Sequence, residues 1–328
     1  MLYHRTLAVF LAVLLSAPLG RTAEVDPYLP EDTESVLNLN IRQILDSDLI
    51  KKHNLLTLAQ EALRGNDQVQ DILKDLGFDP FKDLDRIIVA APGGTEKDRG
   101  LVIVHGRFDV AKFKTKAEEV AKDQSEHLKI HKILSGKHLL YEVNHPDLDD
   151  PLFVALAGRD TVLVSAGKDY VVDALKKSGN SEKPALKNKT FQTLLEKLDA
   201  KQSLSLAVVK NPGIQKAVKK ASGDIQAMIE KIQALGGGLT ISDEIKLELV
   251  ATTKNNRDAK DLGESVSASL KLILGLVSVF TQNQASPEAE FVLEILKSLS
   301  VRNKGETVIL KGRVSSDLIE DTLKKKNK

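Results

Sequence analysis

The side chains best suited to chemistry gather between residues 127 and 150. This segment holds four histidines and four carboxylates, namely His127, His131, His138, His145, Glu142, Asp147, Asp149 and Asp150. Imidazole and carboxylate groups are ligands of Zn²⁺ and of harder divalent ions. A bound ion could activate water, so a metal-assisted hydrolase is one hypothesis, with His127, His131, His138, His145 and Asp147 as the candidate ligands.

The spacing of these histidines limits that hypothesis. His127 and His131 have the same parity on one predicted strand, so they face the same side of it. Residues four apart on a strand are about 13 Å apart, too far to share one ion without further ligands. The alternative is that the segment forms the solvated polar face of an antiparallel sheet.

A Ser-x-x-Lys pattern, Ser165 to Lys168, opens a predicted helix, as in penicillin-interacting hydrolases. The corresponding place near the C-terminus, Ser315 to Asp317, has no lysine. A helix cap, which contributes about 1 kcal/mol, explains both segments. The glycine-rich stretches 92–94 and 236–238 precede no helix start, so neither predicts a phosphate cradle. The sequence favours a non-enzymatic protein and leaves an enzyme as the less favoured alternative.

Residues 266–280 are apolar around nearly the whole circumference of a predicted helix. About fifteen residues that include Lys271 are too few to span a bilayer, so no membrane span is expected in the mature chain. Two alternatives remain open, a central core helix or a helix that lines a groove for a lipid-like ligand or a partner. The side chains concerned are Leu270, Ile273, Leu274, Val277 and Phe280.

Composition excludes several classes of function. The formal net charge of +1 over 328 residues gives no electrostatic footprint for nucleic acid. The chain has no cysteine, which excludes disulfides, thiolate metal sites and thiol nucleophiles. Aromatic residues make up only 4%, so the core must consist of aliphatic side chains. No cofactor is predicted.

The first 23 residues are typical of a secretory signal. His4 and Arg5 precede a short apolar run over residues 6–15, and small residues follow at Ser16, Ala17 and Gly20. Cleavage after Gly20 and cleavage after Ala23 both remain open. The mature protein is therefore expected to be exported, to the periplasm or the extracellular space.

The rest of the chain alternates between predicted strands and helices. Strands are expected at 35–41, 86–91, 101–108, 127–133, 138–143, 152–156, 161–164, 203–209, 239–241, 246–252, 301 and 308–313. Helices are expected at 109–122, 169–177, 191–198, 213–221, 224–234, 258–280, 287–299 and 316–326, besides shorter ones between residues 44 and 76. Most neighbouring strands are joined by short turns, which predicts an α+β fold of mainly antiparallel sheet.

The chain also contains an apparent internal duplication. Residues 158–177 and 305–325 each run from a turn glycine through a Thr-Val strand to a helix ending in Leu-Lys-Lys. The sequence therefore predicts two similar α+β units, 24–180 and 181–328, with a polar boundary near residues 178–184. The helices 169–177 and 316–326 are expected to pack on the sheets of their own units. One pseudo-symmetric domain and two separate domains both remain open.

Two segments, 76–85 and 185–198, carry a resemblance. The first holds a Gly-x-Asp-Pro-x-x-Asp-Leu turn before a strand. These segments resemble uncharacterised secreted proteins of planctomycete-type bacteria, which have a signal peptide and an apparent duplication. The resemblance implies an extracytoplasmic α+β protein and no activity. The expected function is a non-enzymatic binding or structural module, whose partner is an unknown protein or an apolar ligand; the alternatives are a carrier of lipid-like ligands and the metal-assisted hydrolase.

Overall fold

The computed structural model describes residues 25–94, 99–144, 146, 148–177, 184–199, 201–219, 223–283 and 287–326. The predicted signal segment, residues 178–183 of the predicted boundary, and two candidate metal ligands, His145 and Asp147, lie outside the described residues.

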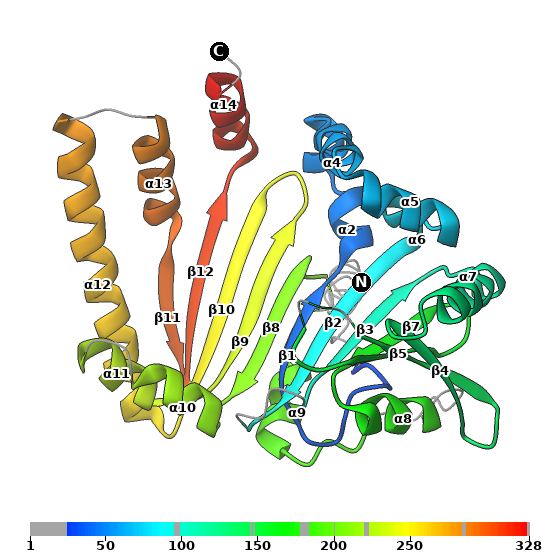
Figure 1. Cartoon of the computed structure of the whole chain (residues 1–328). Helices are drawn as coiled ribbons and strands as arrows, with labels where there is room; N and C mark the ends of the chain where they lie inside the picture. Colours follow the sequence, from blue (N-terminus) through cyan, green and yellow to red (C-terminus); the bar gives the residue numbers. More distant parts are fainter. Residues whose placement is uncertain are drawn as a thin grey trace, which may run out of the picture.

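The described strands form one antiparallel sheet of twelve strands, in the order β11-β12-β10-β9-β8-β1-β2-β3-β7-β6-β5-β4 (Figure 1). The strands are β1 Thr33–Leu39, β2 Leu84–Pro92, β3 Leu101–Gly106, β4 Leu128–Ile133, β5 His138–Val143, β6 Leu152–Leu156, β7 Thr161–Ser165, β8 Leu204–Val209, β9 Ile232–Ile241, β10 Ile245–Thr253, β11 Ser300–Lys304 and β12 Thr307–Val314. The predicted α+β class with mainly antiparallel sheet is confirmed.

Helices flank both faces of this sheet. They are α2 Ile41–Asp46, α3 Asp48–Lys52, α4 Leu55–Arg64, α5 Asp67–Leu76, α6 Pro80–Asp83, α7 Val110–Asp123, α8 Lys168–Lys176, α9 Lys189–Leu195, α10 Pro212–Val218, α11 Gly223–Glu230, α12 Asn256–Asn283, α13 Pro287–Ser298 and α14 Ser316–Lys326. In Figure 1, α12 and α13 stand beside β11 at one margin of the sheet, and α7 lies near β4 at the other.

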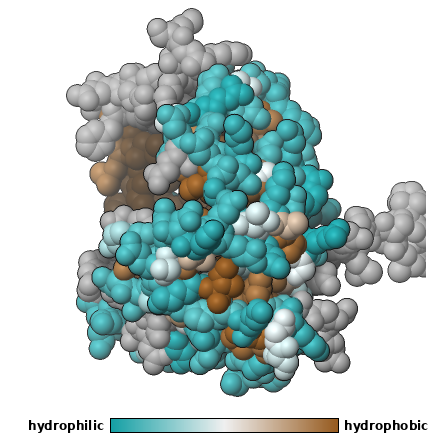
Figure 2. Space-filling view, turned by 45° about the vertical axis from the view of Figure 1, so that its right-hand side comes forward, coloured by the Kyte–Doolittle hydropathy of each residue, from teal (hydrophilic) through white to brown (hydrophobic). Residues whose placement is uncertain are grey.

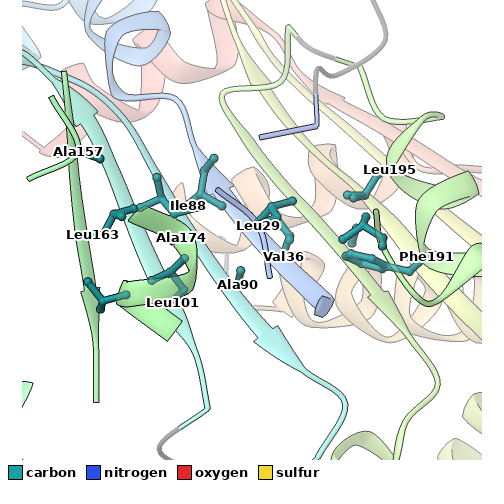
Figure 3. Packing of buried hydrophobic residues seen from close by; sticks show 14 of the residues in the cluster. Leu29, Val36, Ile88, Ala90, Leu101, Ala157, Leu163, Ala174, Phe191 and Leu195 are labelled. Atoms are coloured by element: carbon teal, nitrogen blue, oxygen red, sulfur yellow. The ribbon is translucent and has the colours of Figure 1, made fainter. Parts of the chain in front are cut away.

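The main hydrophobic core lies on one face of the sheet, which we call the core face. Val36 of β1 and Ile88 of β2 pack there beneath α8 and α9, together with the segment that precedes β1 (Figure 3). Phe191 of α9 is fully buried in this cluster. The opposite face, which we call the open face, carries the side chains that alternate with these, including Leu37 and Val89.

Two smaller cores lie on the open face, one near each margin of the sheet. At the β4 margin, α7 packs Ala117 against Leu128 and Tyr141. At the β11 margin, α12 packs Ala259 and Leu262 against β10 and β12. α7 and α12 thus cover the two ends of the open face. The open face of the strands in the middle of the sheet lies between the two smaller cores.

The sheet runs without a break through the predicted boundary between the two units. β1 pairs directly with β8, and Leu37 lies opposite Leu206. The two Thr-Val strands have similar surroundings, because β7 lies between β3 and β6 and β12 lies between β10 and β11. The division into two repeat units stays a prediction.

The helices that follow these two strands lie differently. α8 packs on β6 and β7 as expected and buries Val171 and Leu175. α14 instead packs beside α13 and stands beyond the end of β12 (Figure 1). The expectation that both terminal helices pack on their own sheets therefore holds for α8 alone.

Strand β9 is much longer than the sequence predicted. We expected a helix to run to Ala234 and a strand from residue 239, but the strand begins at Ile232 and continues through the three glycines. A Cβ at Gly238 would lie 1.9 Å from the carbonyl oxygen of Leu204, and one at Gly236 would lie 2.8 Å from Leu194. Glycines stand here because neighbouring groups approach the backbone closely, a feature that the propensity pattern cannot reveal.

Candidate functional site: an apolar sheet face

A continuous row of directly opposite residues crosses the open face of all twelve described strands. It consists of Ile130, Tyr141, Val154, Val164, Val102, Val89, Leu37, Leu206, Gly237, Leu249, Leu310 and Val301. Directly opposite residues of an antiparallel pair share one face of the sheet. Every member except Gly237 has an apolar or aromatic side chain.

A second apolar row runs beside the first, two residues away along the strands. It consists of Leu156, Val162, Val104, Ile87, Leu39, Leu204, Leu239, Leu247 and Gly312. We call the residues of these two rows the apolar sheet face. Since strands are about 4.8 Å apart, it measures several nanometres across.

Helices cover the ends of the apolar sheet face, and its middle is open. Tyr141 is buried under α7, where its ring meets Phe113 at 5.1 Å between centroids. Val301 at the other end packs in the cluster beneath α12. At the centre, Leu37 and Val89 are 40% and 41% exposed. Figure 2 shows hydrophobic side chains gathered in a recess and in patches of an otherwise hydrophilic surface. Adjoining exposed apolar side chains of this kind make the middle of the sheet a candidate binding surface.

Helix α12 is the second exposed apolar element. Of the side chains predicted to line a core or a groove, Leu270, Leu274 and Val277 are half-buried and Ile273 is 42% exposed. The side chain of Phe280 lies outside the described residues. Other apolar side chains of this helix are more exposed than the predicted ones: Leu272 at 66%, Val279 at 58% and Leu276 at 55%. The second half of α12 is therefore not a core helix.

Among the described residues, one helix segment, Asn256–Val279, is long and apolar enough to cross a membrane by length and composition alone. Only 11% of its most apolar window is buried inside the protein. The expectation that the mature chain has no membrane span was based on the apolar residues 266–280 alone, about fifteen residues of this helix. The observed helix continues the segment in both directions, beyond the apolar stretch.

The histidine segment forms the β4–β5 hairpin. His131 Nε2 lies 2.8 Å from Glu142 Oε2, and Lys129 donates to the same carboxylate. These two partners lower the pKa of Glu142, His131 first. His127 lies 3.6 Å from Glu126, and His138 lies opposite Ile133 at the other end of β4. Within the described part of the chain, no three histidine, aspartate or glutamate side chains come close enough together to hold a metal ion.

Ser165 of the Ser-x-x-Lys pattern is 4% exposed. Its hydroxyl donates to the carbonyl of Gly100 and accepts from the backbone N–H of Gly167 at 2.9 Å. Both contacts are structural, and they fix the turn that leads into α8. The N-cap position of α8 is occupied by Gly167, so the helix cap expected in this segment has no side-chain hydrogen bond.

A buried polar network that was not predicted from the sequence lies on the core face. The Asp26 carboxylate, 3% exposed, accepts from Arg86 at 2.8 Å and contacts His105 Nε2 at 2.6 Å. The other ring nitrogen of His105 lies 3.1 Å from the hydroxyl of Thr161. The arrangement has the order of an Asp-His-Thr triad, but Thr161 is 2% exposed, so no substrate reaches its hydroxyl. The network holds the segment before β1 against β2, β3 and β7.

An open cleft of about 920 Å³ lies beside the start of α8. Asp32 accepts there from the hydroxyl of Tyr170 at 2.7 Å and from Arg99 at 2.6 Å. Burial, with a smaller contribution from the Asp32 carboxylate, raises the pKa of Tyr170 to about 12. The cleft mixes both signs of charge, since Lys168 and Lys187 line it together with Glu31 and Asp173. It therefore favours neither an anion nor a cation.

Comparisons with known proteins give a fold likeness alone. No protein-family model and no curated protein matches the chain. Two structures of a protein named TP0453 match, crystal form IV with a TM-score of 0.47 and 13% identity and crystal form I with 0.45 and 12%. The first match covers 92% of this chain and 97% of the other, and the second covers 93% and 98%. The resemblance to secreted planctomycete-type proteins stays a prediction.

Proposed function

We propose that the protein is an exported, non-enzymatic binding protein that holds a lipid-like apolar ligand on the apolar sheet face. The observation that carries the proposal is the exposure of Leu37 and Val89, which are directly opposite neighbours in the middle of the row. A sheet normally covers such side chains with a helix or a second sheet. Here a ligand would take the place of that cover.

The chemistry of the face suits an acyl chain. Leu37 has Leu206 and Val89 as its direct neighbours, and Leu39 and Ile87 stand in the adjacent row. These side chains offer an apolar surface without a hydrogen-bonding group. Removing such surface from water contributes roughly 25 cal/mol per Å², so a long unbranched chain gains more than a compact polar ligand. The exposed side chains of α12, such as Leu272 and Leu276, offer further apolar contact.

Export rests on the basic, apolar and small-residue order of the first 23 residues. A non-enzymatic role is supported by the buried, structurally engaged hydroxyls of Ser165 and Thr161. The metal-assisted hydrolase is a weaker alternative, because no three candidate ligands come together among the described residues. It remains an alternative because His145 and Asp147 lie outside the described residues.

Native mass spectrometry of the full-length protein, purified without detergent, tests the proposal. We expect a co-purifying lipid, and titration with a fluorescent long-chain fatty acid should show saturable binding. Leu37→Gln and Val89→Gln should each weaken that binding about tenfold, because each removes roughly 1.5 kcal/mol of apolar contact. Both side chains are already half-exposed, so the fold should tolerate the changes.

Leu148→Gln is the matched control. Leu148 is 43% exposed and lies in the loop between β5 and β6, away from the apolar sheet face. It should leave binding unchanged. Equal loss of binding in all three variants, or no saturable binding in the unaltered protein, would rule the proposal out. Tight association with phosphatidylcholine vesicles without extraction of lipid would indicate a membrane-surface role instead.

A further inference from the structure

The outer margin of β11 is an open strand edge with a helix beside it. Within the described residues, β11 hydrogen-bonds to β12 alone, and no strand lies on its other side. The two strands are joined by a two-residue turn, and Lys304 lies opposite Thr307 on either side of it. In such a hairpin the flanking residues form the hydrogen-bonded pair, and bonded and non-bonded pairs then alternate along the ladder. The N–H and C=O groups of Val301 and Asn303 consequently point outward.

A pocket lies between this edge and α12. Its volume is about 410 Å³, and it is lined by Val301 and Asn303 of β11 and by residues 263, 264, 267, 268 and 271 of α12. α12 passes close to the strand there, since a Cβ at Gly263 would lie 2.2 Å from Asn303 Oδ1. Figure 1 shows α12 running beside β11 along this margin of the sheet. An edge strand with a pocket between it and a helix is the geometry in which extended peptides add as a further strand.

The other face of the same edge is basic. Arg302 and Lys304 alternate with the pocket residues, so they lie on the core face, and both are exposed. Lys311 and Arg313 of β12 continue the basic strip on that face, and Lys246 of β10 lies directly opposite Arg313. Glu244 and Glu248 pair with Lys246 and Lys311. Among the described residues, Arg302, Lys304 and Arg313 have no carboxylate partner.

We propose that β11 binds an extended segment of another protein by strand addition, and that this segment carries carboxylates at alternate positions. Its backbone would bond to the outward N–H and C=O groups of Val301 and Asn303. One set of its side chains would face Arg302 and Lys304, where opposite charges across neighbouring strands are favourable. The alternate set would enter the pocket beside Val301 and Ala268. Because Glu264, Ser267, Lys271 and Asn303 also line this pocket, it suits small side chains. This site shares Val301 with the apolar sheet face, but four strands separate β11 from β1, which carries Leu37, and the proposal does not rest on the proposed ligand.

Charge favours such a partner over a second copy of this chain. Two β11 strands paired edge to edge would set Arg302 and Lys304 of one copy against the same cations of the other, and like charges on adjacent strands destabilise the pairing. An acidic segment removes that repulsion. Charges on an edge strand can also serve only to prevent pairing, and binding experiments separate these two roles.

The test uses the full-length, isotope-labelled protein and a blocked peptide, Ala-Glu-Val-Glu-Val-Glu-Ala. We expect saturable chemical-shift changes and slower amide exchange at Val301 and Asn303. A peptide with lysines in place of the glutamates should not bind. A shuffled peptide, Ala-Glu-Glu-Glu-Val-Val-Ala, should bind more weakly because its carboxylates do not alternate. Absence of binding by the alternating acidic peptide, or changes confined to the other edge strand β4, would overturn the proposal.

Two variants of one residue isolate the backbone contribution. Asn303→Pro removes the outward N–H without removing a bond to β12, since proline is tolerated at such edge positions. Asn303→Ala removes the side chain and keeps the N–H. We expect the proline variant to lose binding and the alanine variant to retain it.

A charge reversal provides a test that does not depend on how the proline variant folds. Arg302→Glu with Lys304→Glu changes two exposed side chains and should exchange the preference, so that the lysine peptide binds and the glutamate peptide does not. Unchanged preference in this double variant would overturn the proposal as well.

Discussion

Asp26 and His105 lie 2.6 Å apart, Oδ2 to Nε2, and join the segment before β1 to strand β3 on the core face. Arg86 completes the set from β2. Asp26→Ala leaves the Arg86 guanidinium and the His105 imidazole without their shared carboxylate partner. This change should lower the free energy of unfolding by about 3 kcal/mol. Urea unfolding measures the change. Asp85→Ala is the control, because Asp85 pairs with Arg42 at the surface and should cost less than about 1 kcal/mol. Equal losses would refute the structural role of the buried pair.

Phe191→Ala tests whether the predicted units share one core. Phe191 belongs to the second unit, yet it is fully buried in the cluster that holds Val36 and Ile88 of the first. The cavity should cost about 3–5 kcal/mol. We expect one unfolding transition at a lower denaturant concentration, with amide signals of β3 and β10 lost together. Loss of one half before the other would support two independent domains.

Tyr170 should titrate late. Its pKa rises from 10.0 to about 12 through burial first and Asp32 second, so the folded protein keeps the phenol proton after an unfolded chain has lost it. The stabilisation of the folded state that depends on protonated Tyr170 is therefore complete below pH 10. It is lost as the pH rises towards 12. Alkaline titration followed by tyrosinate absorbance should show a late component that Tyr170→Phe removes. A titration unchanged by that substitution would contradict the assignment.

Gly237→Ala should destabilise the sheet severely. Gly237 has φ +130°, and a Cβ there would lie 2.0 Å from the carbonyl oxygen of Glu248. Backbone strain and the clash together should cost on the order of 3 kcal/mol or more. Gly136→Ala is the matched control, since φ is +81° but nothing lies within 4 Å of the added carbon. It should cost about 1 kcal/mol. Thermal melts of both variants measure the difference.

Local patterns were sufficient to predict most elements. The strand at 161–164, for example, is observed as Thr161–Ser165, and the helix at 287–299 as Pro287–Ser298. Alternation and short turns determine such hairpins, because the partners are neighbours in sequence. The β1–β8 pairing could not be predicted in this way, because it joins strands whose connection spans about half of the chain.

The apolar sheet face left a signal in the sequence that the strand assignment alone did not use. Residues 87–91 and 101–104 form continuous apolar runs, which are typical of strands covered on both faces. A sequence shows that both faces are apolar, but it does not show whether a helix covers the second one. The buried network of Asp26 and His105 left no signal, since its members are 79 positions apart. Three-dimensional packing alone brings them together.

The seam between β1 and β8 also has a consequence for biogenesis. Asn38 and Ser205, which bond across it, are separated by 167 positions. A chain that emerges from its N-terminus first presents β1 with one unpaired edge until the residues of β8 have followed. Contacts of such long range slow folding, and unpaired strands expose the chain to aggregation in the meantime. The sheet therefore stays incomplete, with one edge of β1 unpaired, for the time needed to synthesise or translocate about half of the protein.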